Sequence, residues 1–209
     1  MPVLRWIPLA LAAAILTVPL AATSQKVPIP PEVVALFDDI HDIDKLRVIN
    51  PLKLTPEQVD RLIAAVQTAE AEYNRALADA AVPPIRQIAK EIEQTRQAML
   101  AGASVPADFD AKVKTLQEEF VKRRDSADKE TLKSLSAAIR KALTEEQVKT
   151  AISLVKKATA DKDGKPTLRG TDESFFHYYV LHVFVKYPRI VPLLRDIKKA
   201  QAASGDSGR

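Results

Sequence analysis

Apolar residues recur at alternating steps of three and four along most of the chain, which is the period of amphipathic α-helices rather than of β-strands. The most regular run begins at residue 62 and resumes after Pro83-Pro84. Its members are Leu62, Val66, Ala69, Tyr73, Ala76, Ala80, Ile85, Ile88, Ile92, Thr95 and Met99. Because proline lacks the amide hydrogen that a helix interior needs, the proline pair predicts a kink or a short break in this helix.

A second run of the same period follows residues 102–106 (GASVP), which predict a turn. It comprises Phe109, Val113, Leu116, Phe120, Leu132, Leu135, Ile139 and Ala142. Two long amphipathic helices joined by a short turn form an antiparallel hairpin. This arm would be roughly 50–60 Å long at the helical rise of 1.5 Å per residue. It needs other helices, or a second copy of the chain, to cover its apolar seam.

The flanking segments predict an all-α fold in several parts. A first helix begins near Pro31 and ends at Asn50-Pro51, and a later helix covers about 145–160. The predicted organisation is a signal peptide (1–24), a Pro-rich linker (25–31), a helical hairpin domain (32–160), a polar loop (161–172), an aromatic-rich C-terminal helical extension (173–201) and a disordered tail (202–209).

The first 24 residues have the order of a secretory signal peptide. Arg5 precedes an uncharged apolar stretch, and small residues follow at positions 21–24. Cleavage after Ala22 or Ser24 fits this pattern. The alternative is an uncleaved membrane anchor, although the apolar stretch is short for a full span. We therefore expect an exported, periplasmic protein that meets the membrane only through its export signal.

Charge and composition narrow the function classes. Removal of the leader takes away Arg5 and no acid, so the net charge falls from +4 to +3. This mild excess does not indicate nucleic-acid binding. The chain has no cysteine, and it contains no Gly-rich phosphate loop, GxSxG pattern or His-based zinc motif. We expect no enzymatic activity, no cofactor and no small-molecule substrate.

One acidic cluster is a candidate for metal binding. Asp38, His41 and Asp42 have helical spacing that places them on one face, and carboxylates with an imidazole can ligate a divalent ion such as zinc. The alternative is a solvated polar face opposite an apolar one.

The aromatic residues are concentrated near the C-terminus. Six of the ten Phe and Tyr residues lie within the thirteen positions from 175 to 187. One interpretation is a core that closes over the base of the hairpin. The other is an exposed protein-binding surface that includes Phe175, Phe176 and Tyr179.

A five-residue pattern, LTxxQ, occurs twice, at Leu54–Gln58 and at Leu143–Gln147. Its physical reading is a helix start. The threonines, Thr55 and Thr144, are N-caps, and the glutamines reach back to the amides of the caps. The leucines, Leu54 and Leu143, pack against an apolar residue one turn into the helix.

Two copies of this pattern, one on each side of a helical hairpin in an exported chain, resemble the Spy/CpxP family of periplasmic LTxxQ proteins. The resemblance covers about residues 50–160. It implies an all-α fold in which a long bent hairpin dimerises into a thin curved cradle. Family members act as ATP-independent chaperones for unfolded envelope proteins, as inhibitors of envelope-stress sensors, or as metal-responsive sensors. The residues Leu54, Thr55, Gln58, Leu143, Thr144 and Gln147 then have structural roles.

We therefore expect a homodimer that binds unfolded or partner proteins as a periplasmic chaperone or stress-response accessory. Lys122, Arg123 and Arg124, together with Lys112 and Lys114, make the second arm basic, which would speed the capture of acidic chains. The same cations would also keep a long exposed helix soluble. The alternative functions are a structural or adaptor coiled-coil protein with one fixed partner, and a metal-responsive envelope sensor accessory.

Overall fold

The computed structural model describes residues 30–161, 163 and 167–206, and it is all-helical, with no β-strand among these residues. The predicted all-α class is therefore confirmed. The elements are α1 (Pro31–Ile49), η1 (Asn50–Leu52), α2 (Pro56–Gln87), α3 (Ala89–Leu100), α4 (Ala107–Ala142), α5 (Glu145–Ala158), α6 (Asp172–Val180), the short π-helix η2 (Leu181–Val185) and α7 (Ile190–Asp206).

The chain divides into two compact units, Met1–Leu46 and Arg47–Arg209. The described part of the first unit is most of α1, and the second unit holds everything from the last residues of α1 onward. The predicted signal peptide and most of the predicted linker lie outside the described residues. No described helix is both long enough and apolar enough to cross a membrane.

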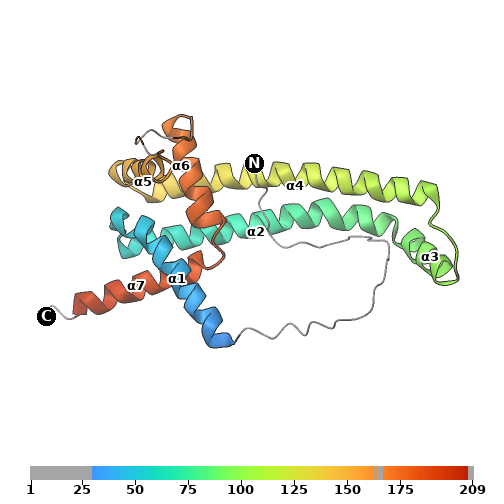
Figure 1. Ribbon diagram of the computed structural model, residues 1–209, viewed down its shortest axis with the longest axis horizontal. Helices are drawn as coiled ribbons and strands as arrows, with labels where there is room; N and C mark the ends of the chain where they lie inside the picture. Colours follow the sequence, from blue (N-terminus) through green and yellow to red (C-terminus); the bar gives the residue numbers. More distant parts are fainter. Residues whose placement is uncertain (1–29, 162, 164–166, 207–209) are drawn as a thin grey trace. The chain divides into compact units, whose positions relative to one another are not determined.

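Within the second unit, α2 and α4 lie side by side and run in opposite directions (Figure 1). Their contact is driven by the apolar seam. On α2 it buries Leu62 and Val66, and on α4 it buries Leu135 and Ile139. Each such side chain contributes roughly 1.5–3 kcal/mol on leaving water. Most of the buried apolar residues of this pair lie at one end. We call it the proximal end and define it as residues 54–72, at and just before the start of α2, with residues 132–142 of α4.

The proline pair does not break α2 where the sequence predicts. The helix continues through Pro83 and Pro84 and ends at Gln87, and Ile88 has a φ of −105° and a ψ of 9°. Each proline removes one backbone hydrogen bond, but its fixed φ is the helical one, so the helix can pass through the pair before it ends. The break at Ile88 then separates α2 from α3.

The apolar seam around the break differs from its prediction. Ile85, before the break, and Met99, after it, are exposed, whereas Thr95 is buried. Figure 1 shows that α3 runs in a different direction from α2, so the heptad spacing does not continue along one face across Ile88. Residues 101–106 then lead into α4, and Gly102 adopts a φ of +93°, a conformation that favours glycine.

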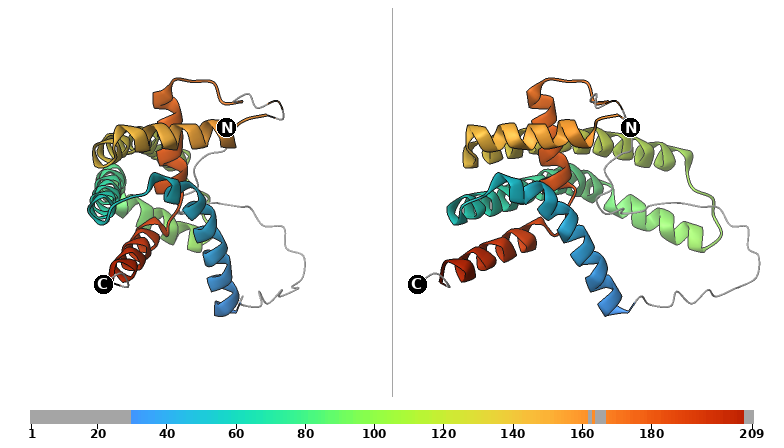
Figure 2. Two further views of the ribbon diagram at one scale, coloured as in Figure 1. Left: turned by 90° about the vertical axis from the view of Figure 1, so that its left-hand side faces the viewer. Right: turned by 60° about the vertical axis from the view of Figure 1, so that its left-hand side comes forward.

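The C-terminal elements pack against the proximal end. α6 packs against α4 and α5, and α7 packs against α2. Figure 2 shows α6 crossing steeply over α5 and the proximal part of α4. The core beneath α6 contains Phe176, Tyr179 and Val180, all of which are almost fully buried.

The sequence predicts a disordered tail from residue 202 onward. This prediction is wrong for residues 202–206, because α7 continues to Asp206. Its last turns are tied to α2. The Gln201 Nε2 donates to the Leu54 carbonyl at 2.7 Å, and the Lys198 ammonium pairs with Asp60 at 2.7 Å. These contacts hold α7 up to its predicted end, and the following Ala202 and Ala203 are good helix formers that favour its continuation. Residues 207–209 lie outside the described part of the chain.

Candidate functional site

Both LTxxQ segments form capping boxes at the starts of α2 and α5. The Thr55 Oγ1 accepts from the Gln58 amide at 3.3 Å, and the Thr55 amide donates to Gln58 Oε1 at 3.0 Å. At α5 the same two hydrogen bonds join Thr144 and Gln147, at 3.2 Å and 2.8 Å. The first amides of each helix, which have no partner within the helix, are satisfied in this way.

The two capping glutamines also bind each other. The Gln58 Nε2 donates to Gln147 Oε1 at 2.7 Å, and the Gln147 Nε2 donates to Gln58 Oε1 at 3.0 Å. Their second amide hydrogens reach backbone carbonyls. Gln58 donates to Ala142 at 3.1 Å, and Gln147 donates to Leu52 at 2.8 Å. We call this arrangement the glutamine pair.

The glutamine pair uses the whole hydrogen-bonding capacity of both side chains. Each Oε1 accepts two hydrogen bonds and each Nε2 donates two, which is the full inventory of a primary amide. Gln58 is only 5% exposed, so an unmade bond there would carry a desolvation cost. The pair ties the start of α2 to the start of α5 and closes the proximal end of the α2–α4 pair.

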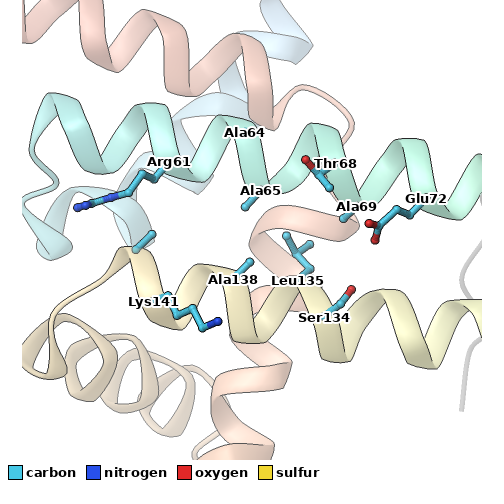
Figure 3. Close-up of a pocket in the computed structure, with 11 residues that line it drawn as sticks. Arg61, Ala64, Ala65, Thr68, Ala69, Glu72, Ser134, Leu135, Ala138 and Lys141 are labelled. Carbon is cyan, nitrogen blue, oxygen red and sulfur yellow. The ribbon is translucent and has the colours of Figure 1, made fainter.

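An open groove lies between α2 and α4 beside the glutamine pair (Figure 3). It has a volume of about 440 Å³ and is lined by Arg61, Ala64, Ala65, Thr68, Ala69, Glu72, Ser134, Leu135, Ala138, Lys141 and Ala142. The floor is made of small apolar side chains. Arg61 and Lys141 lie toward one end, and Glu72 lies toward the other. Such a groove offers surface to apolar groups of a chain or helix.

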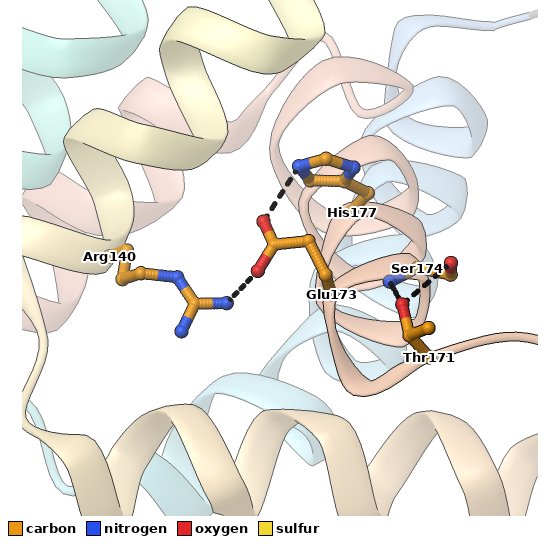
Figure 4. A network of polar contacts seen from close by, with 5 residues as sticks. All are labelled: Arg140, Thr171, Glu173, Ser174 and His177. Atoms are coloured by element: carbon orange, nitrogen blue, oxygen red, sulfur yellow. Dashed lines mark hydrogen bonds and ion pairs between the residues drawn. The ribbon is translucent and has the colours of Figure 1, made fainter.

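A polar network holds the start of α6 (Figure 4). Glu173 pairs with Arg140 of α4 at 2.5 Å and with His177 Nε2 at 3.0 Å. Thr171 caps α6, because its Oγ1 accepts from the Ser174 amide at 3.3 Å. All three side chains are at least one-third exposed, and they join α6 to α4, so the network contributes a modest amount to docking of the helix.

Cations also lie over two aromatic rings of α6. The Arg140 guanidinium is 4.6 Å from the centre of the Phe176 ring, and the Lys156 ammonium is 5.1 Å from that of Phe175. Lys156 also pairs with Asp172 at 2.7 Å. Each cation therefore combines an ion pair with a ring contact at the same helix.

The interpretation of Phe175, Phe176 and Tyr179 as an exposed binding surface is wrong. Their exposed fractions are 4%, 0% and 2%, because α6 turns them toward α4 and α5. The Tyr179 hydroxyl donates to the Val48 carbonyl at 2.9 Å. Burial raises the pKa of Tyr179. The alternative interpretation, a core over the proximal end, describes these residues.

The basic residues of α4 divide into two groups. Lys112 pairs with Glu91 of α3 at 2.7 Å, and Arg124 lies 3.3 Å from Asp125. Lys114, Lys122 and Arg123 are exposed, and they form no hydrogen bond or ion pair with any described residue. These three cations are therefore accessible to an acidic partner.

The structure does not gather the suggested metal ligands. Among the described residues, no group of three or more His, Cys, Asp or Glu side chains could hold a metal ion. This set includes Asp38, His41 and Asp42 of α1. Helical spacing places such residues on one face, but it does not make their donor atoms converge on one point.

The capping boxes could be read from the sequence, whereas the glutamine pair and the groove could not. Gln58 and Gln147 are 89 positions apart, and their identical local patterns do not say that they meet. The sequence feature that points to the groove is the presence of small residues at positions 64, 65 and 138.

Together these features define an all-helical protein whose two capping-box helix starts are joined through side chains. No known protein family, no curated protein and no solved structure matches this chain.

Proposed function

We propose that the chain is an exported homodimeric protein that binds other proteins, as an ATP-independent periplasmic chaperone or envelope-stress accessory of the Spy/CpxP type. One observation carries the proposal. The segment from Val82 to Arg124, which we call the distal segment, exposes apolar side chains and unpaired cations together.

The apolar part of the distal segment is large. Its exposed residues, whose exposed fractions run from 36% to 69%, are Val82, Ile85, Ile92, Met99, Leu100, Val105 and Val121. Where exposed apolar side chains gather into a patch they mark a protein-binding surface, and in this proposal these seven residues supply its apolar part. Lys114, Lys122 and Arg123 add a positive field that would raise the encounter rate with acidic chains.

The proximal end supports the family-like arrangement. The two capping boxes and the glutamine pair hold the ends of α2 and α4 together, so the distal segment projects from a fixed base as a hairpin. Ile85, Ile92 and Met99 are exposed, so they are available for contact with a second copy of the chain.

Charge reversal with a matched control tests the function. The test variant carries Lys114→Glu, Lys122→Glu and Arg123→Glu, and the control carries Lys133→Glu, Lys149→Glu and Lys157→Glu. All six positions are exposed, and both variants change the net charge equally. Light scattering of an aggregating, denatured acidic protein is followed without nucleotide.

We expect the wild-type chain and the control variant to suppress aggregation at near-stoichiometric amounts, and the test variant to lose most of this effect. An absence of suppression by the wild-type chain at several-fold molar excess would contradict the chaperone function. Equal loss in both variants would show that net charge, and not the distal segment, is responsible.

A further inference from the structure

Helix α1 exposes an unusual number of large apolar side chains. Its members with exposed fractions from 46% to 61% are Val34, Leu36, Phe37, Ile40 and Ile43. A helix of this length gains little stability from its backbone alone in water, so an apolar face of this size is typical of a helix that packs against a partner.

Apart from Val34, which occupies a b position, the apolar residues in the first part of α1 follow a coiled-coil register. Val33 and Ile40 occupy successive a positions, and Leu36 and Ile43 occupy the d positions between and after them. β-branched residues at a, with Leu or Ile at d, form the seam of a coiled coil. Phe37, at an e position, widens the seam on one side.

The positions beside this seam are acidic. Glu32 and Asp39 occupy g positions and Asp44 occupies an e position, and Lys45 is the only Lys or Arg between residues 31 and 46. Two copies of α1 would place these carboxylates against one another in either orientation, which opposes self-pairing. An anionic membrane surface would be repelled for the same reason.

We infer that α1 is a docking helix for a basic, coiled-coil-forming helix of another protein. Apolar residues of that helix would cover Leu36, Ile40 and Ile43, and its Lys or Arg residues at e and g would face the acids of α1. This surface shares no residue with the distal segment and carries the opposite charge, so its basic partner is distinct from the acidic clients of the proposed function.

Two labelled helical peptides of about 21 residues, or three heptads, test the inference with the full chain. Both carry Ile at a and Leu at d, and they differ in having Lys or Glu at every e and g position. Fluorescence anisotropy measures the affinity of each. We expect the Lys peptide to bind about tenfold more tightly at low salt, with a smaller difference at high salt.

Variants of α1 then locate the binding. Ile40→Asp should weaken Lys-peptide binding by tenfold or more, whereas Val121→Asp, at an exposed apolar position on α4, should not. Combining Asp39→Lys with Asp44→Lys should reverse the preference between the two peptides.

Equal affinity for the two peptides, or binding that is unchanged by Ile40→Asp, would overturn the inference. Binding of the chain to anionic phospholipid vesicles that is lost in Ile40→Asp would also overturn it and assign α1 to a membrane. Binding of the Glu peptide through the distal segment would not change in the Ile40→Asp variant. Failure of this inference can therefore be distinguished from failure of the proposed function.

Discussion

At the scale of single residues, Gln58 shows how one side chain can serve two levels of structure. Its backbone amide and its Oε1 complete the cap of α2, and the rest of its side chain joins α2 to Gln147 and to the end of α4. A shorter or charged residue could satisfy part of the cap. Only a primary amide supplies two donors and two acceptor sites in this geometry.

The first prediction concerns Gln58→Glu. The carboxylate loses both donors and places a charge in a buried site, so we expect the free energy of unfolding at neutral pH to fall by about 3 kcal/mol. The loss should shrink as the pH is lowered, because a protonated carboxyl regains one donor. Denaturant titration measures both effects. The exposed control Gln67→Glu should change the free energy by less than about 0.5 kcal/mol, and an equal effect of both substitutions would refute the role of the pair.

Tyr73 gives a prediction for alkaline pH. Burial, together with a hydrogen bond to Asp128 and the charge of that carboxylate, raises the pKa of Tyr73 to about 12. Since the ordinary value is about 10, the folded state holds this proton more tightly. The stabilisation from Tyr73 is complete below pH about 10 and is lost as the pH rises toward 12. We expect Tyr73→Phe to flatten the decline of Tm in this window and to remove one phenol from the absorbance titration.

At the scale of elements, α6 is held by two kinds of contact with very different strengths. The ion pair of Arg140 with Glu173 lies at the surface, with 43% and 54% of the side chains exposed. The Phe176 ring is fully buried. Surface pairs are worth at most about 1 kcal/mol, so packing of the ring decides whether α6 docks.

Alanine substitutions measure this difference. Phe176→Ala should lower the free energy of unfolding by about 4 kcal/mol, because it leaves a cavity in the core. Arg140→Ala should lower it by about 1 kcal/mol through loss of the ion pair and the ring contact. Circular dichroism during chemical denaturation measures both values. A larger loss for Arg140→Ala would mean that the surface network holds α6.

Element positions were predictable to different degrees. The beginning of α1 at Pro31 and the beginnings of α2 and α5 follow from proline and capping residues that act locally. The end of α2 was predicted at the wrong residue. A proline pair makes the helix locally less stable, but it does not determine at which residue the helix ends. The end of α7 was predicted five residues too early, because Ala202 and Ala203 favour continuation of the helix to Asp206.

At the scale of the whole molecule, the two ends of the α2–α4 pair differ in what covers them. The proximal end is closed by the glutamine pair, α6 and α7. In the distal segment, all of which the structure describes, Thr95 is the only buried residue and seven large apolar side chains are exposed. This asymmetry suits a protein with one fixed end and one end that binds.

The proposed homodimer gives the last prediction. Sedimentation equilibrium of residues 25–209 should show a reversible dimer, and Ile85→Asp combined with Ile92→Asp should shift it to monomer by burying unpaired charges in the contact. The control, Leu36→Asp with Ile40→Asp in α1, should leave the dimer intact. A monomer at every concentration would contradict dimerisation through the distal segment.

The sequence by itself determined the helical class, both capping boxes and the proximal seam, because period, capping and apolar spacing act within a few turns of chain. Only the tertiary structure decided that Gln58 meets Gln147, that the aromatic residues from 175 to 187 turn inward, and that much of the predicted seam beyond Ile88 lies open to solvent. These outcomes depend on contacts between residues far apart in the chain. Which face of a helix is covered depends on the direction of the neighbouring helices, and that direction cannot be predicted from the local spacing of apolar residues.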